Sequence, residues 1–139
     1  MKLDPEDIRY LHDEQIRLYS GVYGENEPHL INYIADKPFL VLYGQEKYPS
    51  VFQKAAVYLD SFAKGQYFAD GNKRTGLICA LTFLAINGYQ LKVDNFELYK
   101  FTLFVAESSD PTNDMEEMDI DEIAKWFEEN SIVENSSYF

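Results

Sequence analysis

The loop at residues 65–76 carries side chains that could bind a phosphate together with a divalent metal ion. It precedes a strongly helical segment, and the first amides of a helix lack intrahelical acceptors and carry partial positive charge. Two adjacent cations, a carboxylate suited to phosphate-bound Mg²⁺, a glycine that admits a ligand close to the backbone and an asparagine that can cap or donate all fall there. These candidates are Asp70, Gly71, Asn72, Lys73 and Arg74. Phosphate with Mg²⁺ is the ligand that this set predicts.

The same residues also have a plainer interpretation. Asp70-Gly71-Asn72 is an ordinary turn sequence, and Lys73-Arg74 could be solvated helix surface. Because short motifs recur by chance, the spacing alone leaves both interpretations open.

Hydrophobic periodicity predicts a helix on each side of this loop. Apolar residues keep a 3.6-residue spacing over 51–63, and Gly65 follows as a C-terminal glycine. The second helix runs from Asn72 to about residue 87 and is apolar on nearly every face over 77–86. Such a pattern is typical of a helix at the centre of a bundle.

The rest of the chain also favours helices. Capping signals at Asp4-Pro5, Asp94 and Asp119 predict helices that begin directly after them, and another short helix is expected over 29–36. Five to six or more helices with short connections predict an all-α fold. The apolar stretch that follows residue 38 is too short for a helix, and we expect a short extended flap near residues 39–43.

Composition limits the class of protein. The 139 residues are enough for one domain, so we expect residues 1–139 to form a single one. The longest apolar run, 77–86, is well short of the roughly 18 residues that span a bilayer, and the start of the chain does not resemble a secretory signal. The lone Cys79 fits a reducing compartment, so we expect a cytoplasmic protein without membrane contact.

The charge argues against nucleic acid as a ligand. The net charge is −12, and residues 107–134 hold eleven acidic side chains against one lysine. Such a surface repels phosphate backbones.

Residues 68–75, Phe-Ala-Asp-Gly-Asn-Lys-Arg-Thr, resemble the signature of the Fic/Doc family, whose usual form is His-Pro-Phe-x-Asp/Glu-Gly-Asn-Gly/Lys-Arg. Other stretches are similar to the death-on-curing branch of that family. They are Leu11–Gln15, Tyr43-Gly44, Tyr48-Pro49, Leu81–Leu84 and Asn87–Tyr89. The similarity covers about residues 8–91 and implies a compact Fic/Doc helical bundle.

Two positions are similar to the Doc branch rather than to the adenylyl-transferring Fic branch. Lys73 stands where typical Fic enzymes have glycine, and Leu77 stands where they carry a second arginine. The resemblance implies a toxin of a toxin–antitoxin system that transfers the γ-phosphoryl group of ATP to a Ser or Thr hydroxyl of a protein, with elongation factor Tu as the candidate target. A Fic-type adenylyltransferase is the alternative among enzymes.

The resemblance also implies a role for each loop residue. Asp70 would hold Mg²⁺, Gly71 and Asn72 would line the anion hole, and Lys73 and Arg74 would bind the phosphates of ATP. The flap would position the protein target. An antitoxin supplied in trans would control the activity.

Gln66 occupies the position of the family's general base, which is normally a histidine. A glutamine amide can hydrogen-bond to a hydroxyl but has no usable basicity, and loss of a positioned base typically costs about 10²- to 10⁴-fold in rate. We therefore expect impaired catalysis. Neither His12 nor His29 is an evident replacement, and a buried or packed role is predicted for each.

Three explanations of Gln66 stay open. The chain is an engineered or selected inactive form, a natural pseudoenzyme that binds a nucleotide or a partner, or an enzyme whose transfer step needs little help from a base.

Fic proteins often carry an inhibitory helix with the pattern Ser/Thr-x-x-x-Glu-Gly/Asn. Residues 130–135 miss that pattern by one position, since Asn130 replaces Ser or Thr, and this mismatch favours control by an antitoxin.

Overall fold

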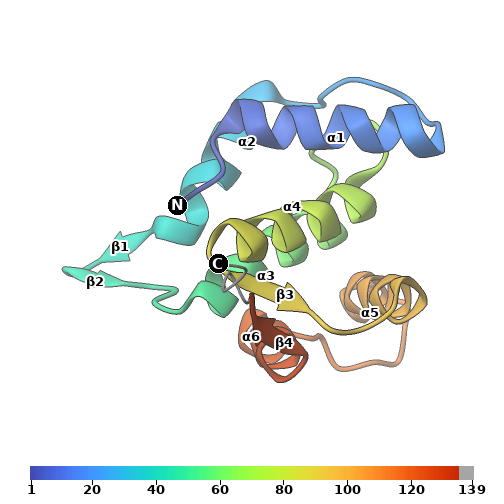
Figure 1. Ribbon diagram of the computed structural model, residues 1–139. Coiled ribbons are helices and arrows are strands. Elements are labelled where there is room, and N and C mark those ends of the chain that lie inside the picture. Colours follow the sequence, from blue (N-terminus) through green and yellow to red (C-terminus); the bar gives the residue numbers. More distant parts are fainter. Residues whose placement is uncertain (135–139) are drawn as a thin grey trace, which may run out of the picture.

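A computed structural model describes residues 1–134, and within them six α-helices are joined by short connections and two small β-ribbons (Figure 1). The helices are α1 (Pro5–Tyr19), α2 (Pro28–Asp36), α3 (Val51–Lys64), α4 (Asn72–Ile86), α5 (Asn95–Ser108) and α6 (Ile120–Glu129). One ribbon pairs β1 (Val41–Leu42) with β2 (Gln45–Glu46), and the other pairs β3 (Tyr89–Leu91) with β4 (Ser131–Val133), both antiparallel. The expected helical fold is confirmed.

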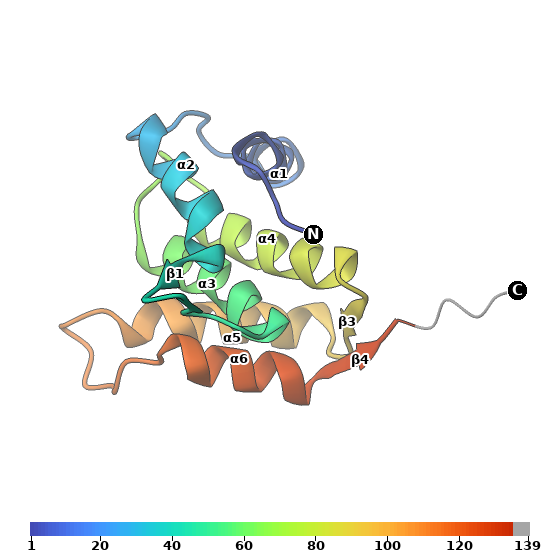
Figure 2. The same ribbon diagram turned by 90° about the vertical axis from the view of Figure 1, so that its left-hand side faces the viewer.

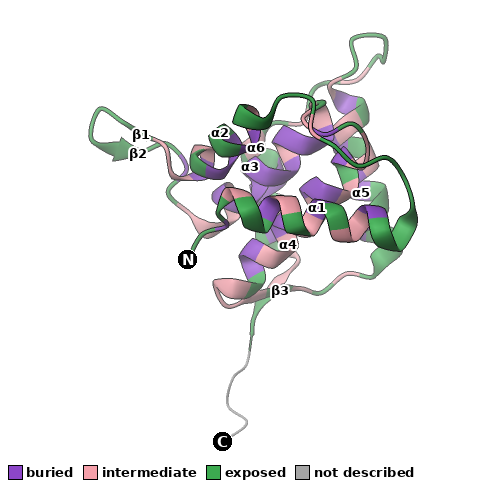
Figure 3. Cartoon of the chain, turned by 90° about the horizontal axis from the view of Figure 1, so that it is seen from above, coloured by how far each residue is buried: buried purple, intermediate pink, exposed green. Residues whose placement is uncertain are grey.

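The helices lie in three layers. Helices α1 and α2 form one outer layer, α5 and α6 form the other, and α3 and α4 lie between them (Figure 2). The middle layer is the most buried part of the molecule (Figure 3), and five successive residues of α3, 55–59, have no exposed surface. The prediction of a central helix after the signature loop is therefore confirmed.

Close packing of α3 against α4 depends on a glycine. A Cβ atom at Gly76 would lie 3.1 Å from Cβ of Phe62 and 3.3 Å from the carbonyl oxygen of Leu59. Both distances are tighter than ordinary Cβ contacts, so Gly76 allows α4 to approach α3 closely.

Four of the helices begin with a side-chain N-cap, at or next to the position where the sequence predicts the helix to begin. Asp4, Ser50 and Asp119 each form a reciprocal capping box, and Asp94 accepts a hydrogen bond from the backbone amide of Glu97. Each such cap typically stabilises the fold by about 1 kcal/mol.

Gly65 ends α3 as predicted, but in a different conformation. Its φ of −116° is extended, not left-handed. A Cβ atom there would lie 2.4 Å from Cε2 of Tyr67. It would also lie 2.8 Å from the carbonyl oxygen of Ser61, so close approach of the ring and of the helix backbone, and not a left-handed turn, is what requires glycine at this position.

The flap expected near residues 39–43 is a β-hairpin over residues 41–46, β1–β2, which projects from the helical body (Figure 1), while Phe39 ends a 3₁₀ turn (Lys37–Phe39) that precedes it. Its turn residues Tyr43 and Gly44 both have positive φ, of 52° and 78°, as mirror-image two-residue turns require. Lys54 on α3 holds its base, because Nζ donates to Oε1 of Glu46 at 2.9 Å and also to the carbonyl oxygen of Tyr48.

The segment that nearly matches an inhibitory helix is largely a strand. Ser131–Val133 forms β4 and pairs with β3, while Asn135 lies outside the described residues. Across residues 1–134, none of the helices is both long and apolar enough to cross a membrane.

Candidate active site

The signature loop between α3 and α4 is held in shape by Asn72. The side chain of Asn72 is buried; its Oδ1 accepts from the amide of Phe68, and its Nδ2 donates to the carbonyl oxygen of Phe68, both at 3.0 Å. Gly71, with a φ of 76°, is the N-cap residue of α4 and supplies no side-chain cap. The first amides of α4 therefore stay available to an anion, and the asparagine shapes the loop instead of capping the helix.

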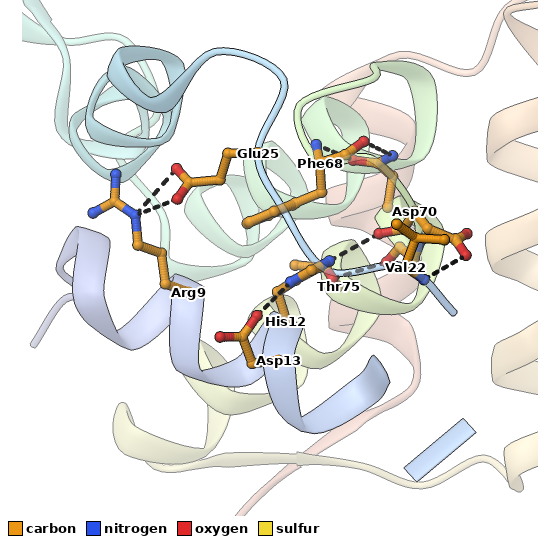
Figure 4. Close-up of polar contacts among 10 residues, drawn as sticks. Arg9, His12, Asp13, Val22, Glu25, Phe68, Asp70 and Thr75 are labelled. Atoms are coloured by element: carbon orange, nitrogen blue, oxygen red, sulfur yellow. Dashed lines mark hydrogen bonds and ion pairs between the residues drawn. The ribbon is translucent and has the colours of Figure 1, made fainter. Parts of the chain in front are cut away.

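The loop that joins α1 to α2 lies alongside the signature loop, which the sequence did not indicate. The amide of Ala69 donates to the carbonyl oxygen of Gly24 at 2.9 Å, and the amide of Asn26 donates to that of Tyr67 at 3.0 Å. Arg9 on α1 holds this loop through Glu25, with Nε 3.1 Å from Oε2 (Figure 4). The α1–α2 loop (residues 20–27) is therefore docked on the signature loop and supports it from outside the cleft.

Backbone amides from both loops orient the carboxylate of Asp70. Oδ1 accepts from the amide of Gly71 at 2.8 Å, and Oδ2 accepts from the amide of Val22 at 3.2 Å (Figure 4). A Cβ atom at Gly21, whose φ is +136°, would lie 2.7 Å from Oδ2. Only glycine lets the α1–α2 loop approach Asp70 this closely.

The two signature cations differ in their surroundings. The side chain of Arg74 is half-buried; its Nη2 donates to the carbonyl oxygen of Ser20 at 3.2 Å, and its guanidinium carbon lies 5.7 Å from the ring centre of Tyr19. Lys73 is exposed. One hydrogen-bonded and one exposed cation therefore flank the start of α4.

A cleft of about 730 Å³ opens next to these groups, a volume typical of small-molecule sites. All five predicted binding residues, 70–74, line it, so the structure brings them together. Gln15 and Tyr19 of α1 also line it. The remaining wall is mostly apolar and comes from α4 and α5: Leu77, Ile78, Leu81, Asn95, Leu98, Tyr99 and Leu103. Gln15 falls in a stretch that resembles the death-on-curing branch, but no motif in the sequence identifies Tyr19 or the α5 residues, because their contribution depends on helix packing.

Gln66 is exposed and lies beside the cleft, not among the residues that line it. Its Oε1 is 3.4 Å from Nδ2 of Asn72, and its backbone carbonyl accepts from Asn26. Neighbouring Tyr67 packs against Phe62, and burial raises the pKa of its hydroxyl.

The two histidines do not take the place of the missing imidazole. His12 is fully buried on α1, as predicted, whereas the side chain of His29 is exposed on α2, so the prediction of a packed role is wrong for His29.

The donor set fits Mg²⁺ only in the company of phosphate. Within residues 1–134, no group of three His, Cys, Asp or Glu side chains is placed to hold a metal ion. Asp70 is a single carboxylate, and each of its oxygens keeps a second lone pair beyond the backbone hydrogen bond. Mg²⁺ commonly takes one or two carboxylates plus phosphate oxygens and water, so these residues fit it as part of a nucleotide complex.

Known proteins share both the signature and much of the chain around it. The model of the Fic/DOC family matches residues 2–84. "Protein kinase doc" of Escherichia phage P1 is 36% identical over 104 residues, which are 75% of this chain and 81% of that protein. "Toxin Doc" of Mycolicibacterium smegmatis is 43% identical over 65 residues, which are 47% of this chain and only 50% of that protein. This chain therefore belongs to the Fic/Doc family, in its death-on-curing branch.

Proposed function

We propose that this chain is a Doc-type toxin that binds Mg²⁺-ATP and transfers the γ-phosphoryl group to a Ser or Thr hydroxyl of a protein, with Gln66 limiting the rate. Elongation factor Tu is the candidate target and an antitoxin is the candidate regulator. The names of the two relatives, a toxin and a protein kinase, support this assignment.

One observation carries the proposal. The uncapped start of α4, the carboxylate of Asp70 and the cations Lys73 and Arg74 all face a single cleft. Amides and guanidinium groups placed in this way bind phosphate oxygens, and a lone carboxylate beside them suits the metal that accompanies ATP.

The chemistry follows from those positions. The hydroxyl oxygen of the target attacks the γ-phosphorus, the bond to the leaving ADP oxygen breaks, and the hydroxyl proton leaves to water. When bound, Mg²⁺ neutralises charge on the phosphates. Arg74, held by the carbonyl oxygen of Ser20, and the first amides of α4 stabilise the equatorial phosphate oxygens.

Gln66 supports a second candidate function. Its carboxamide can hold the hydroxyl but cannot take its proton, so the chain as it stands could act as a nucleotide-binding protein that performs no transfer. The two functions share the phosphate site and differ only in turnover.

The binding site is tested by substitution of its charged residues. Asp70→Ala and Arg74→Ala should each weaken Mg²⁺-ATP binding about tenfold or more, because each removes a charge that faces the phosphates. Titration calorimetry measures this. Asp36→Ala and Arg17→Ala are matched controls, since both side chains are exposed and lie outside the cleft. Equal affinity in all four variants would refute the phosphate site.

The transferred group is tested with labelled ATP. Protein labelled from γ-labelled but not α-labelled ATP supports the kinase. Label from the α position would assign the chain to AMP transfer instead, and no label at all from a protein that binds Mg²⁺-ATP would favour the inactive binding protein.

A further inference from the structure

We propose that His12 is a positioning residue that fixes the peptide between Asp70 and Gly71, and through it the carboxylate of Asp70. The proposal rests on the proposed function, since it concerns the same site. His12 lies on α1, outside the signature, and is fully buried.

A direct hydrogen bond joins His12 to the signature loop. Nε2 of His12 is 2.8 Å from the carbonyl oxygen of Asp70 (Figure 4). A carbonyl oxygen can only accept, so Nε2 carries the proton and donates.

That carbonyl belongs to the same peptide group as the amide of Gly71. The amide donates to Oδ1 of Asp70 at 2.8 Å, so His12 holds one end of a planar unit whose other end holds the carboxylate. Rotation of this peptide would break both hydrogen bonds at once. His12 therefore acts on the carboxylate without touching it.

The imidazole is itself fixed on its other sides. Its ring stacks on Phe68, with 3.8 Å between ring centres and 6° between planes, and Nδ1 lies 2.9 Å from Oδ1 of Asp13. An apolar side chain could fill the space as well but could not donate to Asp70. A buried side chain with both nitrogens engaged favours orientation of the loop over simple packing.

Two substitutions separate donation from packing. His12→Phe keeps an aromatic ring against Phe68 but removes the donor, whereas His12→Gln keeps a terminal N–H at similar reach. We expect His12→Phe to weaken Mg²⁺-ATP binding about 10- to 100-fold, as loss of a partner that orients a ligand residue typically does, and His12→Gln to stay near the parent. Without Mg²⁺, His12→Phe should lose less affinity for ATP, because Asp70 then has no metal ion to coordinate.

A second readout needs no nucleotide. Hydrogen exchange at the amides of Gly71 and Val22, both donors to Asp70, should accelerate in His12→Phe and not in His12→Gln. The amide of Leu59, which is fully buried in the middle of α3, reports global opening, and His29→Phe, at an exposed site, controls for the substitution itself.

The outcomes divide cleanly. Parent-like binding and exchange in His12→Phe, or equal losses in His12→Phe and His12→Gln, would overturn the proposal and leave His12 a packing residue. If His12→Phe does not fold, His12→Asn replaces it, because its amide is too short to reach Asp70. If the parent does not bind Mg²⁺-ATP, the proposed function fails, while the exchange of Gly71 and Val22 still decides the role of His12.

Discussion

The side chain of Gln66 is exposed beside the cleft, with its Oε1 3.4 Å from Nδ2 of Asn72. The loop around it is held through backbone groups and Asn72, so an imidazole at position 66 needs no rearrangement of the loop. We predict that Gln66→His raises the rate of phosphoryl transfer by about 10²-fold or more, because it supplies the absent base. Transfer from γ-labelled ATP to the protein target measures this, and growth arrest on expression is a second readout.

Gln66→Ala serves as the control for this substitution, since it removes the carboxamide without adding a base. Its rate should stay close to that of the parent. If Gln66→His binds Mg²⁺-ATP normally and transfers nothing, the inactive binding protein becomes the better account. An ordinary enzyme rate in the parent itself would show that no base is missing.

At the scale of elements, the α1–α2 loop decides how Asp70 is presented. Gly21 and Gly24 both have positive φ, but only at Gly21 would a Cβ atom meet Asp70; at Gly24 nothing lies within 4 Å. We predict that Gly21→Ala and Gly24→Ala each lower the free energy of unfolding by about 1–3 kcal/mol through backbone strain. Only Gly21→Ala should also weaken Mg²⁺-ATP binding, because it displaces the loop from the carboxylate.

Urea denaturation and titration calorimetry on this pair separate strain from the contact with Asp70. Equal nucleotide affinity in the two variants would show that the close approach at Gly21 does not matter for the site.

The elements themselves could be predicted largely from local signals. Capping residues such as Asp4 and Asp119 mark helix starts because their side chains bond to amides three residues away, and the apolar run of α4 indicates its central place. The docking of the α1–α2 loop could not be predicted, since it depends on backbone pairing between residues far apart in the sequence, such as Gly24 and Ala69. Gly65 shows the same limit: its position was predicted, but its cause is the close approach of the Tyr67 ring and the carbonyl oxygen of Ser61.

At the scale of the whole molecule, two titratable side chains are enclosed by the middle layer. Burial raises the pKa of the Cys79 thiol above its ordinary 9.0, and burial together with the nearby Cys79 raises the pKa of the Tyr58 hydroxyl above 10.0. The folded state therefore keeps protons that the unfolded chain releases. Their stabilising contribution is complete below about pH 9 and declines as the pH rises beyond it.

We predict that the free energy of unfolding falls above about pH 9, with a slope approaching about 1.4 kcal/mol per pH unit for each of the two groups. Urea denaturation at several alkaline pH values measures the slope. Cys79→Ala and Tyr58→Phe should each reduce it, since each removes one titrating group. A stability that does not change between about pH 8 and about pH 11 would contradict the prediction.

The α1–α2 loop contacts Asp70 and Arg74 through its backbone, and this has a consequence for sequence variation. Val22 contributes its amide and Ser20 its carbonyl oxygen, so neither side chain takes part in orienting Asp70 or Arg74. The side chain at position 22 is therefore free to vary, with proline excluded because it lacks the N–H. Position 20 is more restricted, because Ser20 has a φ of 61°, a left-handed backbone that bulky and β-branched residues rarely adopt. A saturation scan of Val22, scored by Mg²⁺-ATP binding, should find broad tolerance, whereas the same scan of Ser20 should favour small residues and asparagine.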